Sequence, residues 1–161
     1  AMITGGNARV GIVGGSEQVY GHRKRIEGFC ETAVQHYPGL EITAVCHHED
    51  DDDSAKEQTE RMLREHPEIS ALFLVAAGVG GVCQAVIEAG REELTLVCFD
   101  GTPVAAEMIR RGLIKAAVCQ HPYTQGYKSV QTAFRYLITG EKPARDCLHL
   151  KTEILIRENL T

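Results

Sequence analysis

Three polar side chains suited to binding a small molecule lie near the ends of separate apolar segments. Asp100 and Gln120 each follow a short apolar run directly, and Arg25 lies in a basic stretch shortly after the first such run. A carboxylate accepts hydrogen bonds, a guanidinium donates a planar fork, and a carboxamide does one of each. Together they match adjacent hydroxyls of a sugar or the edge of a polar ring. The ordered nucleophile, base and oxyanion donor of an acyl-transfer site are missing, so we expect no catalytic residues and no enzyme.

The elements that position these residues can be predicted from hydrophobic patterning. Short apolar runs rich in β-branched residues are typical of strands buried on both faces. We predict strands at Arg9–Val13, Glu41–Cys46, Ala71–Val75, Thr95–Phe99 and Lys115–Cys119, with a final amphipathic strand at Leu148–Ile156. Between them, helical periodicity ending near glycine or proline predicts helices at Tyr20–His36, Ser54–His66, Gly81–Ala89, Pro103–Arg111 and Thr124–Leu137.

This alternation predicts an α/β fold with a doubly wound parallel sheet, a Rossmann-like three-layer sandwich with right-handed crossovers. Ligands of such sheets bind beyond the carboxyl ends of the strands, because loops and helix N-termini converge there. We therefore expect Asp100, Gln120 and the arginines of the first helix to lie at one edge of the sheet.

Three further features invite other chemistry. The glycines of Gly78–Gly81 resemble a phosphate-binding loop, but no Lys-Ser/Thr pair follows, so a tight turn before a helix is the preferred interpretation. The stretch His47–Asp50, followed by three more aspartates, resembles a metal site, yet neighbouring residues on one loop rarely converge on an ion. We expect a solvated acidic loop there, with no metal and no cofactor. A small enzyme using Cys119 or His121 is an alternative, although neither has a suitable partner nearby in sequence.

Bulk composition limits the partners and suggests a location. The net charge is −5 and lysines and arginines do not cluster, so we expect no direct contact with nucleic acid or a membrane surface. No apolar run approaches the ~20 residues that span a bilayer, and the first residues do not resemble a signal peptide. The six cysteines lie within or beside apolar segments without any C-x-x-C pair, a pattern typical of core thiols in a reducing compartment. We therefore predict a cytoplasmic location.

Three stretches resemble motifs of a single superfamily. They are Arg23–Phe29 (RKRIEGF), Val97–Gly101 (VCFDG) and Gln120–Gly126 (QHPYTQG), in the superfamily's order and spacing. That superfamily unites periplasmic sugar-binding proteins with the effector domains of lactose-repressor (LacI) family transcription regulators. The resemblance extends from Arg9 to about Asn159.

The resemblance implies roles for particular residues. In the superfamily, the second arginine of R-x-R-x-x-G-F, the aspartate of the F-D-G turn and the glutamine before the proline contact the ligand. Many members also have an asparagine at the end of the third strand, where this chain has an alanine; that change would suit a less polar ligand or a sugar held differently. The expected ligand-binding positions are Arg25, Asp100, Gln120, Tyr20, Arg23 and Ala76.

The resemblance further implies that the chain is the C-terminal lobe of a two-lobed, type I periplasmic-binding-protein-like fold. On this interpretation residues 1–8 are a linker, 9–120 form the effector-binding lobe, 121–140 are a crossing helix that would pack on a missing N-terminal lobe, and 141–161 contain the return strand. The crossing helix would have lost its partner surface, so we expect a homodimer in which helix 124–138 is exchanged between copies.

Two functions are compatible with these features. The first is the effector-sensing lobe of a LacI-type transcription regulator. It would bind a sugar-like small molecule and control DNA binding allosterically through an absent N-terminal helix-turn-helix domain. The alternative is the C-terminal lobe of a periplasmic sugar-binding protein of an ABC transporter.

Overall fold

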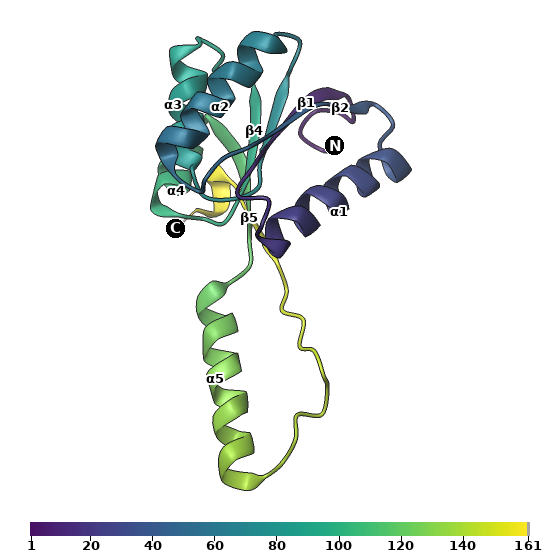
Figure 1. Cartoon of the computed structure of the whole chain (residues 1–161), viewed down its shortest axis with the longest axis vertical. Coiled ribbons are helices and arrows are strands. Elements are labelled where there is room, and N and C mark those ends of the chain that lie inside the picture. Colours follow the sequence, from purple (N-terminus) through teal and green to yellow (C-terminus); the bar gives the residue numbers. More distant parts are fainter. Residues whose placement is uncertain (161) are drawn as a thin grey trace.

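A computed structural model describes residues 1–160 as a twisted sheet with helices on both faces and one helix that projects away from it (Figure 1). The strands are β1 (Ala8–Gly14), β2 (Leu40–His47), β3 (Ala71–Leu74), β4 (Thr95–Phe99), β5 (Ile114–Cys119) and β6 (Glu153–Leu155). The helices are α1 (Tyr20–His36), α2 (Asp52–Glu65), α3 (Val79–Glu88), α4 (Pro103–Arg110), α5 (Pro122–Thr139) and a short 3₁₀ turn, η1 (Arg157–Asn159).

The sheet has the order β2-β1-β3-β4-β5-β6. Strands β1 to β5 pair in parallel, and β6 pairs antiparallel with β5 at one edge. The predicted α/β class with a doubly wound parallel sheet is confirmed. The reversal of strand order between β1 and β3 opens the carboxyl edge of the sheet at that point, which is where ligands of such folds bind.

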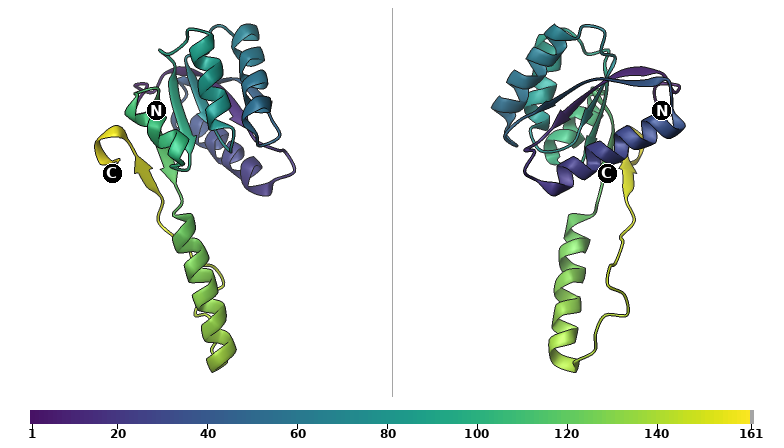
Figure 2. Two further views of the ribbon diagram at one scale, coloured as in Figure 1. Left: turned by 90° about the vertical axis from the view of Figure 1, so that its left-hand side faces the viewer. Right: turned by 45° about the vertical axis from the view of Figure 1, so that its right-hand side comes forward.

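Two layers of helices cover the sheet. Helices α2, α3 and α4 lie on one face and α1 lies on the other (Figure 2). The larger core cluster forms under α2, α3 and α4 and includes Leu72, Leu74 and Leu96 from the sheet. On the opposite face a smaller cluster forms under α1, where the Phe29 ring stacks on Phe73 with centroids 4.5 Å apart.

Helices α2 and α3 begin two residues earlier than predicted, each for a local reason. Helix α2 begins at Asp52 rather than Ser54, because the Asp51 carboxylate accepts a hydrogen bond from the Ser54 N–H at 2.9 Å and caps the first turn. Helix α3 begins at Val79 rather than Gly81, after Gly78 turns the chain with a left-handed backbone conformation.

The last strand is shorter than predicted. Only Glu153–Leu155 pair with the sheet, opposite Ala117–Cys119, whereas alternation of apolar residues predicted a strand over Leu148–Ile156. The difference arises because the preceding segment runs beside α5, beyond the end of β5, and so meets no strand with which it could pair (Figure 1).

Helix α5 stands apart from the rest of the fold. It extends away from the sheet, and none of its residues is buried (Figure 1). Its exposed side chains include several large apolar ones: Tyr123, Tyr127, Val130, Phe134, Leu137 and Ile138. Among residues 1–160, no helix combines the length and apolar character needed to cross a lipid bilayer.

Candidate functional site

The carboxyl ends of the parallel strands form an edge that we call the rim, and Asp100 and Gln120 meet there. Asp100 follows β4 and Gln120 follows β5. The Gln120 side-chain amide donates to both carboxylate oxygens of Asp100, at 3.1 and 3.3 Å. Adjacent strands bring these two residues together because β4 and β5 end at the same edge.

Arg25 reaches the same place from α1. Its Nη1 donates to the Val75 carbonyl oxygen at 2.6 Å, and its guanidinium lies 4.2 Å from the centre of the Phe99 ring. Its Nη2 is 4.0 Å from the Asp100 carboxylate. That distance is too long for a hydrogen bond, so the arginine and the aspartate attract each other while both keep hydrogen-bonding capacity for a third group.

Exposure leaves these groups accessible to a ligand. The side chains of Arg25 and Asp100 retain 21% and 39% of their exposure, respectively. Contacts with Val75, Phe99 and Gln120 hold them in place, so little side-chain entropy remains to be lost on binding. The result is an ordered acceptor and an ordered donor beside an aromatic surface, an arrangement that suits a polyhydroxylated molecule.

Backbone conformation singles out the same edge. Across residues 1–160, three residues other than glycine have a positive φ: Asp50 (60°), Asp100 (63°) and His121 (53°). They follow β2, β4 and β5, respectively. This conformation costs free energy for a residue with a Cβ, and such residues concentrate at ligand sites and switches.

Two of the expected residues lie outside this group. The Tyr20 ring is 65% exposed and sits 5.7 Å from the Lys24 ammonium. The Arg23 guanidinium donates to the Glu17 carbonyl oxygen at 2.9 Å. In the described structure neither contacts Arg25 or Asp100, so a ligand role for Tyr20 and Arg23 stays a prediction.

Ala76, at the end of β3, has neighbours that the sequence did not suggest. A Cβ placed on Gly15 would lie 2.6 Å from the Ala76 Cβ, 2.7 Å from His22 Nδ1 and against Asp50 Oδ1. These groups therefore crowd around one point of the rim, between β1 and β3. Asp50 and His22 belong to the site region although sequence reasoning missed both; the available signal was that His22 precedes Arg25 by three residues and so shares its helix face.

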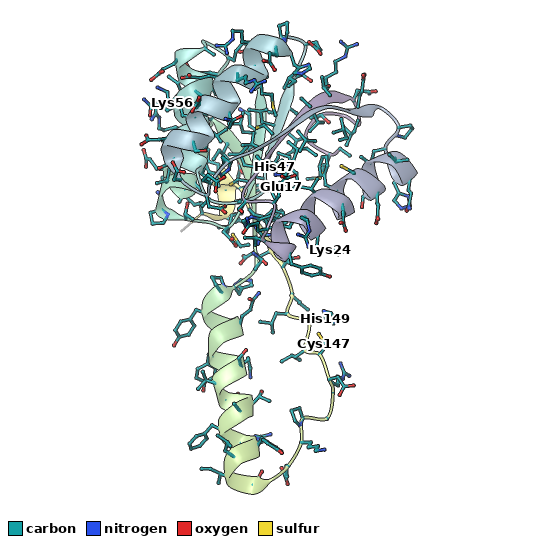
Figure 3. The ribbon with its side chains drawn as sticks, in the orientation of Figure 1. Glu17, Lys24, His47, Lys56, Cys147 and His149 are labelled. Carbon is teal, nitrogen blue, oxygen red and sulfur yellow. The ribbon has the colours of Figure 1, made fainter. Side chains whose placement is uncertain are left out.

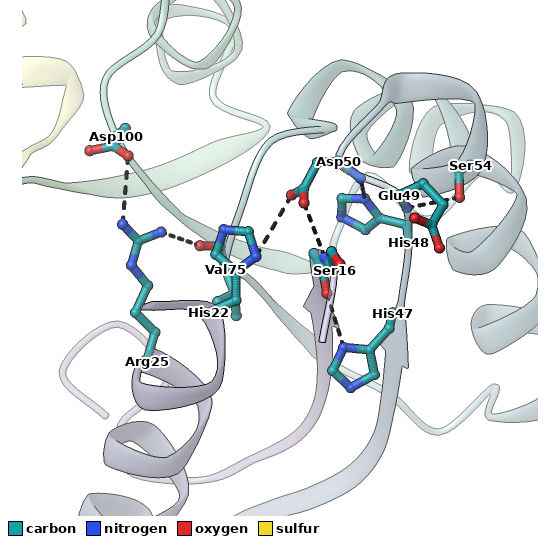
Figure 4. A network of polar contacts seen from close by, with 11 residues as sticks. Ser16, His22, Arg25, His47, His48, Glu49, Asp50, Ser54, Val75 and Asp100 are labelled. Atoms are coloured by element: carbon teal, nitrogen blue, oxygen red, sulfur yellow. Dashed lines mark hydrogen bonds and ion pairs between the residues drawn. The ribbon is translucent and has the colours of Figure 1, made fainter. Parts of the chain in front are cut away.

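The acidic run is exposed at Glu49 and Asp51–Asp53, as predicted, and two of its carboxylates also hold the local structure. Asp50 accepts from the Ser16 N–H at 3.1 Å, and its own N–H donates to His48 Nδ1 at 3.1 Å (Figure 4). Asp52 accepts from the Gly81 N–H at 3.0 Å, at the start of α3. His48 is buried, and burial lowers its pKa from the ordinary value of 6.5.

Other exposed titratable side chains are dispersed over the surface. Lys56 lies on α2, and Cys147 and His149 lie on the segment that returns from α5 (Figure 3). Within residues 1–160, no group of three or more histidine, cysteine, aspartate or glutamate side chains is arranged to hold a metal ion.

Comparisons with known proteins identify relatives. Residues 1–142 match the family model described as a periplasmic binding protein domain. The ribose import binding protein RbsB of Escherichia coli (strain K12) is 30% identical over 123 residues, which cover 74% of this chain and 40% of that protein. The chain therefore spans less than half the length of this relative.

Two solved structures share the fold over nearly the whole chain. GanP, a glucose-galactose binding protein from Geobacillus stearothermophilus, is 29% identical with a TM-score of 0.88, and the match covers 99% of this chain and 57% of that one. AraP, an arabinose binding protein from the same organism, is 25% identical with a TM-score of 0.86, covering 99% and 58%. The fold is thus that of one lobe of a type I periplasmic-binding-protein-like protein, as predicted.

These comparisons favour one of the two functions. The relatives are sugar-binding proteins, and the comparisons give no support to a LacI-type regulator, to DNA binding or to transcription regulation. They are consistent with the expectation that the chain is not an enzyme. Neither the predicted dimer nor the individual ligand contacts are tested by them.

The prediction of a cytoplasmic location is wrong, because the similarity is to periplasmic and other solute-binding proteins of sugar import. It rested on the unpaired cysteines, and all six are indeed unpaired. Burial raises the pKa of Cys83 and of Cys98 to about 12, so the reactive thiolate is scarce. Cys83 and Cys98 are therefore inert in an oxidising compartment too, and they do not report on location.

Proposed function

The chain belongs to the periplasmic binding protein domain family, and from that premise we propose that it is the sugar-binding C-terminal lobe of a solute-binding protein of an ABC-type importer. The observation that carries the proposal is the convergence of Arg25, Asp100 and Gln120 at the rim, with hydrogen-bonding capacity left over. The relatives that bind ribose, arabinose, glucose or galactose support a sugar as the ligand.

Each group would take a distinct part of the sugar. The Asp100 carboxylate accepts hydrogen bonds from a hydroxyl, while Arg25 donates to the oxygen of that hydroxyl or its neighbour. Gln120 keeps the carboxylate oriented through its amide. The Phe99 ring lies under the Arg25 guanidinium and keeps it oriented toward the rim.

Helix α5 would connect this lobe to a second one. We propose that residues 9–120 form the binding lobe and that the helix within 121–140 packs on another lobe of the intact protein. The support is that none of its residues is buried here while Val130, Phe134 and Leu137 are exposed. In the absence of that lobe, we propose that the same face pairs with a second copy of this chain, exposed apolar faces being prone to association.

A sugar titration tests the function. Binding of D-ribose, L-arabinose, D-glucose and D-galactose to the chain is measured by saturation-transfer NMR, with sugar raised into the tens of millimolar because one lobe supplies only part of a clamp. We expect at least one of these sugars to bind, and Asp100→Asn to abolish that binding.

The matched control is Glu107→Gln, the same loss of charge on an exposed side chain of α4, which should bind like the unaltered chain. The proposal is contradicted if no sugar binds, or if Asp100→Asn and Glu107→Gln behave alike.

A further inference from the structure

We propose that Asp50 and His22 form a second hydrogen-bonding position for the ligand, beside Ala76, and that this position helps to select among sugars. The inference rests on the proposed function, since it concerns the same rim. It goes beyond the proposed function because it names two residues outside the group of Arg25, Asp100 and Gln120. These two residues would bind the part of the ligand that lies over the end of β3.

The first support is location. Asp50 Oδ1, His22 Nδ1 and the Ala76 methyl crowd the same small space, as their approach to Gly15 shows. Ala76 itself brings only a methyl group to the end of β3 and has no means of binding a hydroxyl. Polar groups from the β2–α2 loop and from α1 stand there instead.

The second support is unused hydrogen-bonding capacity. His22 Nδ1 and Asp50 Oδ1 lie 3.8 Å apart, which is too far for a hydrogen bond. Among residues 1–160 neither atom has a hydrogen-bond partner, although both are shielded from solvent. Buried polar atoms are nearly always paired, so two unpaired ones side by side indicate a missing group. Their side chains still reach the surface, with 16% exposure for His22 and 29% for Asp50, so a ligand at the rim can approach them.

The third support is continuity with the group around Arg25. Asp100 and Arg25 form one pair of facing polar groups at the rim, and His22 and Asp50 form another (Figure 4). Arg25 and His22 share a face of α1 because they are three residues apart. A sugar held by Asp100 and Arg25 would therefore extend its further hydroxyls toward His22 and Asp50.

The fourth support is that Asp50 is held rigidly. Its left-handed backbone, with a φ of 60°, matches that of Asp100 at the end of β4. Hydrogen bonds with the Ser16 N–H and His48 Nδ1 fix this conformation. Only one carboxylate oxygen, Oδ2, is occupied by Ser16, so Oδ1 remains to accept from a ligand hydroxyl whose oxygen faces the His22 ring.

Asp50→Asn tests the proposal with little change of shape, since the amide keeps an oxygen for the Ser16 N–H. Dissociation constants for D-ribose, L-arabinose, D-glucose and D-galactose are measured by NMR titration. A hydrogen bond to a charged group is lost, so we expect the preferred sugar to bind at least about fivefold more weakly and the ranking of the four sugars to change. Glu49→Gln, the neighbouring loss of the same charge, should alter each constant by less than about twofold.

His22→Ala provides a second variant that leaves the acidic loop untouched, and it should shift the ranking in the same way. If Asp50→Asn and His22→Ala bind all four sugars like the unaltered chain while Asp100→Asn loses binding, the second position is refuted and the proposed function stands. If the unaltered chain binds none of the four, the proposed function fails and this inference fails with it.

Discussion

Replacing Arg25 by lysine should destabilise the fold by about 1–3 kcal/mol. The guanidinium donates to the Val75 carbonyl oxygen, stacks on the Phe99 ring and faces Asp100. A hydrogen bond from a charged donor contributes about 1.5–3 kcal/mol and a cation–π contact about 0.5–1 kcal/mol. A lysine ammonium can keep one of these contacts but not both, because it lacks the planar fork. Since the side chain is 21% exposed, water replaces part of what is lost, which sets the lower end of the range.

The assay is urea unfolding followed by far-UV circular dichroism. The denaturation midpoint should fall while the slope stays unchanged, since the surface exposed on unfolding is the same. Arg110→Lys is the matched control, because Arg110 is half exposed and its ion pair with Glu107 is long, at 3.9 Å. Its free energy of unfolding should stay within about 0.5 kcal/mol of the original. Equal midpoints for the two variants would refute the claim that Arg25 is anchored at the rim.

Three further predictions concern the rim and helix α5. Gly15→Ala should destabilise the fold by about 1–3 kcal/mol in thermal unfolding, because its Cβ would collide with crowded neighbours. Gly28→Ala, in open space on α1, should stabilise the fold by about 0.5–1 kcal/mol. Equal effects of the two substitutions would contradict the crowding at Gly15. Burial lowers the pKa of His48, so the unfolded chain binds more protons below about pH 6.5, and stability should fall as pH drops from about 7.5 to 5.5. That fall should be smaller in His48→Asn. If neither the unaltered chain nor this variant changes its urea midpoint across this pH range, the predicted role of His48 is wrong. Phe134→Glu should abolish concentration-dependent association in sedimentation, while Val34→Glu, an exposed apolar residue of α1, should not; a chain that sediments as a monomer at all concentrations would exclude the exchange of helix α5.

Much of the fold could be predicted because its strands are buried on both faces and its helices have clear ends. Helix α1 and strand β4 have the predicted boundaries. The start of α2 was misplaced because Asp51 and Asp52 were interpreted as loop charges, whereas one caps α2 and the other holds the start of α3. Periodicity does not reveal such a contact between segments.

The site was predictable in part for a topological reason. Asp100 and Gln120 follow neighbouring parallel strands, so their approach follows from strand order alone. Asp50 could not be placed in this way, because its position depends on a left-handed backbone conformation that no local residue type demands. The docking of α5 stays a prediction, since an amphipathic helix indicates that a surface is covered without naming what covers it.

The most direct test of the rim as a sugar site is a ¹⁵N-resolved NMR titration of the unaltered chain with the sugar that binds best. Signals from the Gln120 side-chain amide and the Gly101 backbone N–H should move, and those of Gly90 and Gly112, at the helix ends on the opposite edge of the sheet, should stay fixed. Shifts confined to α5, or spread evenly over the chain, would contradict the account.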